Sequence, residues 1–582
     1  MKHEFSLTLR LSDSSGKPVL EVIGSHGASL GHSDDGDVTV AILADLHAAE
    51  SATQCAQAWS GTSGDPVTLL APTAAGALAI HRRELEAHAV APKIGLRQIY
   101  WRALGNVLAF ASSPRLLKGL PGDPLSVRPD ALFRYLYFHV LPGPDSFFDG
   151  VSKLDAGHAL RWNTTGVTVT RYWHPRFTDT AGQSEPEAAV ELQGLLSSAV
   201  KKSLRDRNDA GAFLSGGLDS STVAGLAARE RPGIPTVSMG FNASGYDEMA
   251  YARIASRHFG THPLEYYVTP EDVLATLPDL AAAFPEPFGN SSAAAAYHCA
   301  RVAKENGIGL LLAGDGGDEL FGGNDRYARQ LTFERYGRVP RSLRSALERS
   351  VGAAAAYTQT FPIGKIRSYL QQANTPLPDR LQSYNFLHRH DPEQVFAPEI
   401  LETADQTAPL RQLREEYAAP QTQSAVNRML FLDWKFTLHD NDLVKVNTMC
   451  QFAGIDVVYP MLDPAVVEFS MRVPGDWKVR NGELRWFYKR AMRDFLPRPI
   501  IDKTKHGFGL PFGVWTRTHK GLGRLSEESL GSLATRGYFR REFLQEALRL
   551  HREGHAAYYG ELVWILMTLE LWLQVHAPDA RI

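Results

Sequence analysis

The sequence contains little cysteine. Cys55, Cys299 and Cys450 are the three cysteines among 582 residues, and they lie far apart along the chain. No two of them form a Cys-x-x-Cys pair, so neither a disulfide framework nor a cysteine zinc site is predicted. We interpret them as small, buried, apolar residues of a protein in a reducing compartment.

Long hydrophobic runs are also missing. No stretch of about 18 apolar residues occurs, and so no membrane insertion is predicted. The first residues, MKHEFSLTLR, mix charged with apolar side chains and lack the continuous apolar segment of a signal peptide. We therefore expect a cytoplasmic location.

The sequence has no excess of charge of either sign. It contains 61 Lys and Arg against 64 Asp and Glu, for a net charge of −3. This balance argues against a surface that mainly neutralises phosphate backbones, so we expect no nucleic-acid partner. With 44% hydrophobic residues over this length, an ordinary globular protein of about two to four domains is predicted.

Two large regions differ in their patterning. Residues 1–175 read as β-rich, with alternating runs at Phe5–Leu11 and Val167–Trp173. A polar segment with Pro and Gly follows, and we take residues 176–190 as a linker. Residues 191–582 then alternate strands with helices, which predicts a parallel sheet that binds ligands beyond the carboxyl ends of its strands. The predicted elements are strands at Ala210–Leu214, Pro235–Phe241, Leu264–Val268 and Ile308–Ala313, and helices at Ser220–Arg229, Tyr246–Phe259 and Ala293–Asn306.

The rest of the second region is predicted to be helical. Residues 341–429 form a polar helical extension with breaks at Pro362, Pro376 and Pro392. From Tyr538 onward the chain is amphipathic and rich in aromatic residues, which predicts helices that pack on the domain core.

A glycine–serine motif follows the first of these strands. In Ser215–Ser221 (SGGLDSS), two glycines permit close backbone approach, and the helix that follows offers free N–H groups to an anion. The motif predicts a phosphate-binding loop, and Asp219 inside it would repel phosphate unless Mg²⁺ intervenes. A simple turn capped by Ser220 is the alternative.

A second glycine-rich loop follows the Ile308–Ala313 strand. It reads Gly314–Gly323 (GDGGDELFGG) and contains Asp318. Since both loops follow strands of one predicted sheet, both can open on the same edge. Asp219 and Asp318 could then share one or two hard cations that bridge the phosphates of ATP, although acidic glycine loops also cap helices.

These two motifs together resemble the pyrophosphate-loop domain of the class B asparagine synthetase family. The resemblance extends over nearly the whole chain, through Ile94–Tyr100, Leu154–Leu160, Lys445–Asp463 and Lys503–Phe508. It implies an N-terminal, degenerate glutaminase-like αββα sandwich of the Ntn-hydrolase type, followed by an α/β ATP-pyrophosphatase domain with a helical extension. The implied reaction uses ATP and Mg²⁺ to adenylate a carboxylate, from which an amine displaces AMP.

The resemblance also implies roles for individual residues. Met239 would lie at the adenine, Gly314 near the ribose or the α-phosphate, and Asp219 and Asp318 on magnesium. Lys505 would neutralise charge on the adenylate and the tetrahedral intermediate. The pyrophosphate would be held by Leu214, Ser215, Gly216, Gly217, Asp219, Ser220 and Ser221.

The sequence departs from the family at two places. A glutamine-dependent member needs a cysteine at its processed N-terminus, whereas this chain begins Met1-Lys2-His3, so the first domain is expected to lack glutaminase chemistry. Asp315 stands where asparagine synthetases carry glutamate and β-lactam synthetases tyrosine. Asn447 and Thr448 replace an Asp-Arg pair, Asp456 replaces glutamate and Val458 replaces arginine. These changes put an aspartate substrate in doubt.

Among relatives that use an amine of their own substrate, we favour a lasso-peptide cyclase. Its partners would be a precursor peptide, a leader-peptide-binding protein and a leader peptidase, and residues 341–429 could help to line its peptide cavity. Asp315, Asp440 and Asp442 are candidate bases for the attacking amine. A β-lactam synthetase, an ammonia-dependent asparagine synthetase, an enzyme that adenylates tRNA bases and a non-catalytic scaffold are the alternatives.

Overall fold

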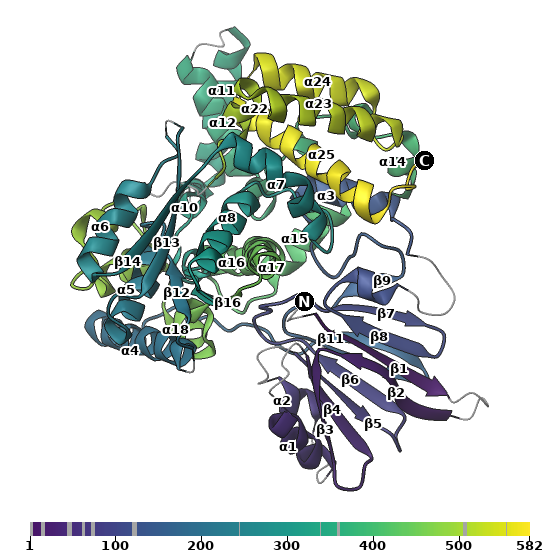
Figure 1. Cartoon of the computed structure of the whole chain (residues 1–582). Helices are drawn as coiled ribbons and strands as arrows, with labels where there is room; N and C mark the ends of the chain where they lie inside the picture. The colour runs from purple at the N-terminus through teal and green to yellow at the C-terminus, as the bar shows by residue number, and fades with distance from the viewer. Residues whose placement is uncertain are drawn as a thin grey trace.

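The computed structural model describes residues 4–12, 18–43, 49–60, 65–71, 76–118, 125–205, 207–243, 245–337, 339–357, 361–503, 509–554 and 556–582. Figure 1 shows two parts, a pair of stacked sheets that carries the N-terminus and a larger mixed α/β part. In the described part of the chain, no helix combines the length and the apolar character that a bilayer crossing needs.

Two antiparallel sheets form the N-terminal part. The first has the strand order β2-β1-β8-β7-β9, and the second has the order β11-β10-β6-β5-β4-β3. The strands of the first sheet are β1 (Ser6–Ser12), β2 (Pro18–His26), β7 (Tyr100–Leu104), β8 (Val107–Ala111) and β9 (Val151–Lys153). Those of the second are β3 (Ala28–His32), β4 (Val38–Leu43), β5 (Ala77–His81), β6 (Glu86–Val90), β10 (His158–Asn163) and β11 (Gly166–Arg171).

Every residue of β4 is buried because both faces of its sheet are covered. Ala41 and Leu43 point to the core between the two sheets, while Val40 and Ile42 pack against helices α1 (Ala49–Ser60) and α2 (Pro66–Leu70). The far face of the first sheet packs against α3 (Pro129–Phe138) and the C-terminal part. The layers are therefore helix, sheet, sheet, helix, which confirms the predicted αββα sandwich.

The C-terminal part is built on a five-stranded parallel sheet with the order β14-β13-β12-β15-β16. Four of its strands lie within a few residues of the predicted ones, and the fifth, β16, was not predicted. The strands are β12 (Ala210–Phe213), β13 (Pro235–Phe241), β14 (His262–Val268), β15 (Leu310–Leu312) and β16 (Asp456–Val458). Helices α5 (Leu218–Glu230), α6 (Met249–Phe259), α8 (Ser292–Glu305) and α17 (Leu443–Ala453) flank it (Figure 1).

The chain reverses its direction across this sheet at β12. From β12 it proceeds outward through β13 to β14, and then it returns to place β15 on the other side of β12. At such a reversal the loops after the two neighbouring strands diverge and leave a crevice at their carboxyl ends. The two glycine-rich loops follow these two strands.

Helices make up the rest of the molecule. Helix α4 (Glu185–Leu204) begins with a capping box between Ser184 and Glu187, so it starts inside the segment that we predicted as linker. The extension between residues 341 and 429 is helical as predicted, but Pro362 lies in the first turn of α12 (Phe361–Asn374) and does not break it. Its other main helices are α11 (Arg341–Tyr357), α13 (Pro392–Val395), α14 (Pro398–Thr403) and α15 (Ala408–Ala418).

The aromatic C-terminal segment packs on the core as predicted. Helices α23 (Lys520–Thr535) and α24 (Arg541–Glu553) lie over α25 (Ala556–His576). Trp564 and Trp572 on α25 are almost fully buried. Cys299 and Cys450 are buried as we expected, whereas Cys55 on α1 is only half-buried.

Candidate active site

Two tight loops meet at the crevice between β12 and β15. Gly216 has a φ of +69°, and a side chain there would clash with the backbone of Tyr251 and Ala252. A Cβ on Gly314 would lie 2.6 Å from the backbone nitrogen of Ser220. Gly216 therefore lets the first loop pack against α6, and Gly314 lets the loop after β15 approach the start of α5, which places the two motifs side by side.

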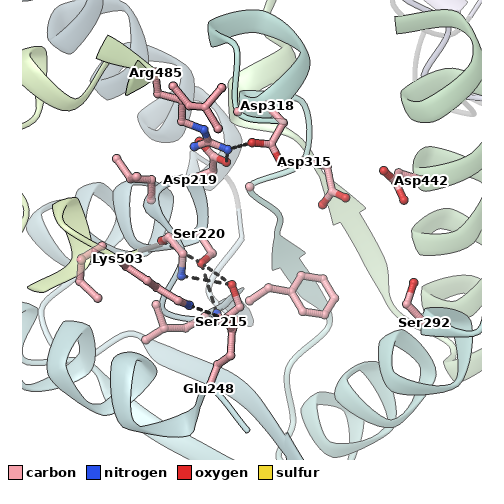
Figure 2. A pocket seen from close by; sticks show the side chains of 18 of the residues that line it. Ser215, Asp219, Ser220, Glu248, Ser292, Asp315, Asp318, Asp442, Arg485 and Lys503 are labelled. Carbon is pink, nitrogen blue, oxygen red and sulfur yellow. Dashed lines mark hydrogen bonds and ion pairs between the residues drawn. The ribbon is translucent and has the colours of Figure 1, made fainter. Parts of the chain in front are cut away.

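The two loops open into a cavity of about 650 Å³. Figure 2 shows Ser215, Asp219 and Ser220 of the first loop and Asp315 and Asp318 of the second around it. The predicted residues that line it are Leu214, Ser215, Gly217, Asp219, Ser220, Met239, Gly314, Asp315, Asp318 and Asp442. Gly216 and Ser221 do not line it: Gly216 packs against α6, and Ser221 is a fully buried residue of α5.

Hydrogen bonds within the first loop fix its shape. The backbone N–H of Ser215 donates to the hydroxyl of Ser220 at 3.2 Å, and the N–H of Gly217 donates to the Ser215 hydroxyl at 3.3 Å. The two hydroxyls lie 3.0 Å apart. This closed loop leads into the N-terminus of α5, where free N–H groups favour an anion.

Arg485 bridges the two predicted metal ligands (Figure 2). Its guanidinium donates to both carboxylate oxygens of Asp219, at 2.6 and 2.7 Å, and also to Asp318. The Arg485 side chain is 7% exposed. Sequence reasoning missed this residue. The sequence did hold one indication of such a residue: two acidic loops at one sheet edge need a positive charge between them.

Asp219 and Asp318 can hold a divalent cation. Both carboxylates reach one guanidinium, so they are close enough to share a single ion, and Mg²⁺ prefers oxygen ligands. The guanidinium would then have to turn from the carboxylates toward the phosphates. These two residues therefore fit the magnesium that was predicted.

The lining of the cavity is strongly acidic. Of the described residues that line it, eight are acidic and four are basic. A polyanion such as ATP would be repelled by this balance unless divalent cations entered with it. The acidic residues are Asp219, Glu248, Asp315, Asp318, Asp325, Asp442, Glu483 and Asp502, and the basic ones are Lys445, Arg485, Lys489 and Lys503.

Asp315 lies apart from the Arg485 bridge, on the side of the cavity that α17 forms (Figure 2). Burial raises its pKa to about 6, while nearby Lys445 opposes the shift and Asp442 adds to it. Lys445 itself binds Asp442 at 2.6 Å. A carboxylate with this pKa can take up or release a proton near neutral pH.

Lys503 lies at the opposite end of the cavity. Its ammonium pairs with Glu248 at 3.0 Å, lies 3.4 Å from the carbonyl oxygen of Gly216 and sits over the ring of Tyr251. Sequence reasoning selected Lys505 from the same segment, and Lys505 lies outside the described residues. Lys503 is therefore a second residue that the sequence did not identify.

The structure does not bring Asp440 to the cavity. Asp440 is buried at the contact with the N-terminal part, where Lys435 pairs with it at 3.0 Å and with Asp155 at 2.5 Å. Asp440 is therefore not placed to act as a base at this cavity. Asp155, His439 and Asp440 could in principle ligate a metal, but the ammonium of Lys435 already lies against both carboxylates.

The helical extension does not reach this cavity, because no described residue between 341 and 429 lines it. Cys299 contacts the cavity and is buried as expected, and burial raises the pKa of its thiol. A protonated thiol is a poor nucleophile, so Cys299 has no apparent chemical role there.

Two family models match this chain. The family model described as asparagine synthase matches residues 191–574, and the one described as glutamine amidotransferase domain matches residues 73–173. Asparagine synthetase (glutamine-hydrolyzing) 1 of Bacillus subtilis (strain 168) is 24% identical over 487 residues, which are 83% of this chain and 74% of that protein.

A relative from Mycobacterium tuberculosis (strain ATCC 25618 / H37Rv), also named as a glutamine-hydrolyzing asparagine synthetase, is 27% identical over 451 residues, 76% of this chain and 67% of that protein. Among solved structures, the allosteric regulatory enzyme of purine biosynthesis overlaps 45% of this chain and 74% of its own chain, with 11% identity and a TM-score of 0.16. A TM-score this low supports no conclusion about the fold.

Proposed function

The chain belongs to the asparagine synthase family, and on that premise we propose that it is a lasso-peptide cyclase. Members of the family are ATP-dependent ligases that form amides, and this chain is such a ligase. In the proposed reaction it adenylates the side chain of an Asp or Glu in a precursor peptide. It then joins that carbonyl to the amine at the N-terminus of the same peptide.

One observation about the cavity carries this proposal. All four basic residues that line it, counted over the described chain, already have acidic partners. Lys445 pairs with Asp442, Lys503 with Glu248 at 3.0 Å and Lys489 with Glu483 at 4.0 Å, while Arg485 holds Asp219 and Asp318.

The pairing bears on the choice of substrate. Free aspartate brings an α-carboxylate besides the reacting one, and a buried carboxylate without a cationic partner is costly. The small amino acids that β-lactam synthetases convert into a ring also bring a second carboxylate. The reacting residue of a peptide has its α-carboxyl group in an amide bond, so it brings no second anion. The cavity therefore suits a peptide side chain better than a free amino acid.

The acidic lining also suits an attacking amine. Asp315 has a pKa of about 6, so near neutral pH it is mostly ionised and can accept a proton from an ammonium group. Asp442, held by Lys445, lies beside it and keeps a negative charge near the amine. We assign Asp315 as the base and Asp442 as its neighbour that orients the amine.

The proposed reaction has two steps. The peptide carboxylate attacks the α-phosphorus of ATP and pyrophosphate leaves, held by the Ser215–Gly217 loop and the start of α5. The amine then attacks the acyl carbon, loses its proton to Asp315, and AMP leaves as the amide forms. Mg²⁺, held by Asp219 and Asp318, would supply charge neutralisation for the phosphates.

Ammonia released from glutamine is not part of the proposal. Cys55 is the one cysteine in the sequence of the N-terminal part, and it lies on α1 with its thiol pKa raised by burial. A nucleophilic thiol needs the opposite shift. The precursor peptide, a leader-peptide-binding protein and a leader peptidase remain proposed partners.

ATP–pyrophosphate exchange tests the function. We expect exchange with a peptide that carries a free N-terminus and an internal Asp or Glu, and a product that is lighter than this peptide by one water. The same peptide with an acetylated N-terminus should support exchange but give no ring, and an Asn or Gln at the acidic position should abolish both. Exchange with aspartate alone, or asparagine from aspartate and ammonia, would overturn the proposal in favour of an asparagine synthetase.

A further inference from the structure

A second cavity, of about 450 Å³, lies between the N-terminal and C-terminal parts. Arg97 and Ser113 line it from the N-terminal side, and the end of α7 (Pro270–Ala283) and one face of α17 line it from the other. In the described part of the chain, it shares no lining residue with the nucleotide cavity. Its volume is in the range of about 300–1,000 Å³ that is typical of small-molecule sites.

Arg97 is a cation of this cavity that has no direct partner among the described residues. Over the described residues, its guanidinium forms no ion pair and no hydrogen bond. Burial lowers the pKa of Arg97, and the charges of Tyr459 and Asp456 only partly oppose this shift. Asp456 is itself bound to Arg207 at 2.7 Å. A half-buried guanidinium without a partner is costly, and a bound anion would remove that cost.

The second arginine of the cavity is different. Arg115 pairs with Glu4 at 2.5 Å, so its charge is already balanced. One unbalanced cation matches an anion with a single charge better than a phosphate with two. A guanidinium is also shaped to bind the two oxygens of a carboxylate side by side.

Two other polar groups here have unused bonding capacity. The hydroxyl of Ser113 is buried and has no hydrogen-bond partner among the described residues. Asp279 lines the cavity from an exposed position on α7, and over the same residues its carboxylate forms no ion pair. The cavity thus has a guanidinium and a hydroxyl inside and a carboxylate at its edge. These groups are complementary to a ligand that has both a carboxylate and an amine.

We propose that this interdomain cavity binds a free α-carboxylate, as carried by an amino acid or by the C-terminus of a peptide. Arg97 binds the carboxylate, Ser113 donates its hydroxyl hydrogen to it, and Asp279 receives an ammonium group where the ligand has one. The site is separate from the nucleotide cavity, so binding there can be measured without turnover.

Isothermal titration calorimetry tests the site, on the full chain saturated with Mg²⁺ and a non-hydrolysable ATP analogue. The probes are the twenty free amino acids, their C-terminal amides, and trialanine with a free or an amidated C-terminus. We expect at least one free-acid probe to bind and its amide to bind about tenfold or more weakly, since the charge-assisted pair is lost. Binding of amino acids alone, of trialanine alone or of both identifies the source of the carboxylate.

Variants separate the proposal from a structural role of Arg97. Arg97→Gln should lower the affinity for the free-acid probe about tenfold while the nucleotide affinity is unchanged. Arg97→Lys should restore part of the affinity for the probe. Asp279→Asn should weaken the binding of only those probes that have a free amine. Arg83→Gln, at an exposed arginine paired with Asp37 on the distant sheet, is the matched control and should have no effect. The proposal fails if no free acid binds, if amides bind equally well, or if Arg97→Gln binds like the wild type.

Discussion

Arg485 donates to both carboxylate oxygens of Asp219, and the same guanidinium reaches Asp318. The guanidinium therefore stands where the two carboxylates would hold a metal. A protein that binds Mg²⁺ at this point must exchange one counter-ion for another, and this exchange can be measured apart from turnover.

Replacement of Arg485 should change how the protein responds to magnesium. Arg485→Gln leaves two neighbouring carboxylates without a counter-charge, which we expect to cost on the order of 3 kcal/mol of stability. Added Mg²⁺ should then raise the melting temperature of the variant more than that of the wild type. Differential scanning calorimetry with and without Mg²⁺ measures both. Arg524→Gln is the control, at a side chain that is 80% exposed and pairs with Glu528 away from the cavity. An equal rise in melting temperature with Mg²⁺ in both variants would contradict the exchange.

Asp315 should control the pH dependence of ring formation. With a pKa of about 6, it becomes ionised as the pH rises through that value, so kcat should increase across the same range. Asp315→Asn should lower kcat by about 10²–10⁴-fold and remove this step from the pH profile. A pH–rate profile that keeps the step in the variant would assign it to another group.

The same shift predicts an effect on stability. The folded-state pKa of Asp315 is raised above the unfolded value, so between about pH 4 and pH 6 the folded protein binds more protons than the unfolded one. Stability therefore falls as the pH rises through this window. Asp315→Asn should remove that loss and melt at a higher temperature than the wild type at pH 8, but not at pH 4. A variant that melts below the wild type at pH 8 would contradict this sign.

Loss of a metal ligand should abolish the first chemical step. Asp318→Ala removes one of the two carboxylates that can hold Mg²⁺, and we expect no detectable ATP–pyrophosphate exchange. Asp579→Ala, at an exposed carboxylate far along the chain, should leave exchange unchanged. Cys299→Ala should also keep turnover, since burial keeps that thiol protonated. Loss of turnover in the cysteine variant would show that the chemistry has been misplaced.

Lys435 should be needed for the contact between the two parts of the molecule. Its ammonium lies 2.5 Å from Asp155 and 3.0 Å from Asp440, and all three side chains are at most 10% exposed. Lys435→Met leaves two buried carboxylates unbalanced, which should cost about 3–5 kcal/mol.

Thermal melting and limited proteolysis at neutral pH measure that cost. The double variant Lys435→Met, Asp155→Asn should recover part of the loss, because one of the unbalanced charges is gone. The exposed Lys520→Met is the control. If Lys435→Met melts like the wild type, the buried pairs do not stabilise this contact.

The strands and loops of the site could be predicted because their signals are local. The buried run Pro235–Phe241 matches β13 residue for residue, and the two glycine motifs follow strands as predicted. Arg485 could not be predicted in this way. It comes from a short segment without periodicity and reaches Asp219 only through the tertiary fold.

The misplacement of Asp440 has a physical reason that the sequence already held. Asp440 and Asp442 lie two positions apart on one helical stretch, η4 (Trp434–Asp442), and residues at that spacing do not share a face. When Asp442 and Lys445 point into the nucleotide cavity, Asp440 must point elsewhere. The helix periodicity could have excluded one of the two carboxylates.

The distance in sequence between Asp219 and Arg485 bears on how the protein is made. The two residues are 266 positions apart. At a synthesis rate of about 5–20 residues per second, the ribosome adds Arg485 roughly 10–50 seconds after it adds Asp219. During that interval the N-terminal sandwich can fold, while the acidic loops have no arginine to neutralise them. Free Mg²⁺ in the surrounding solution is then the available counter-ion for the growing chain.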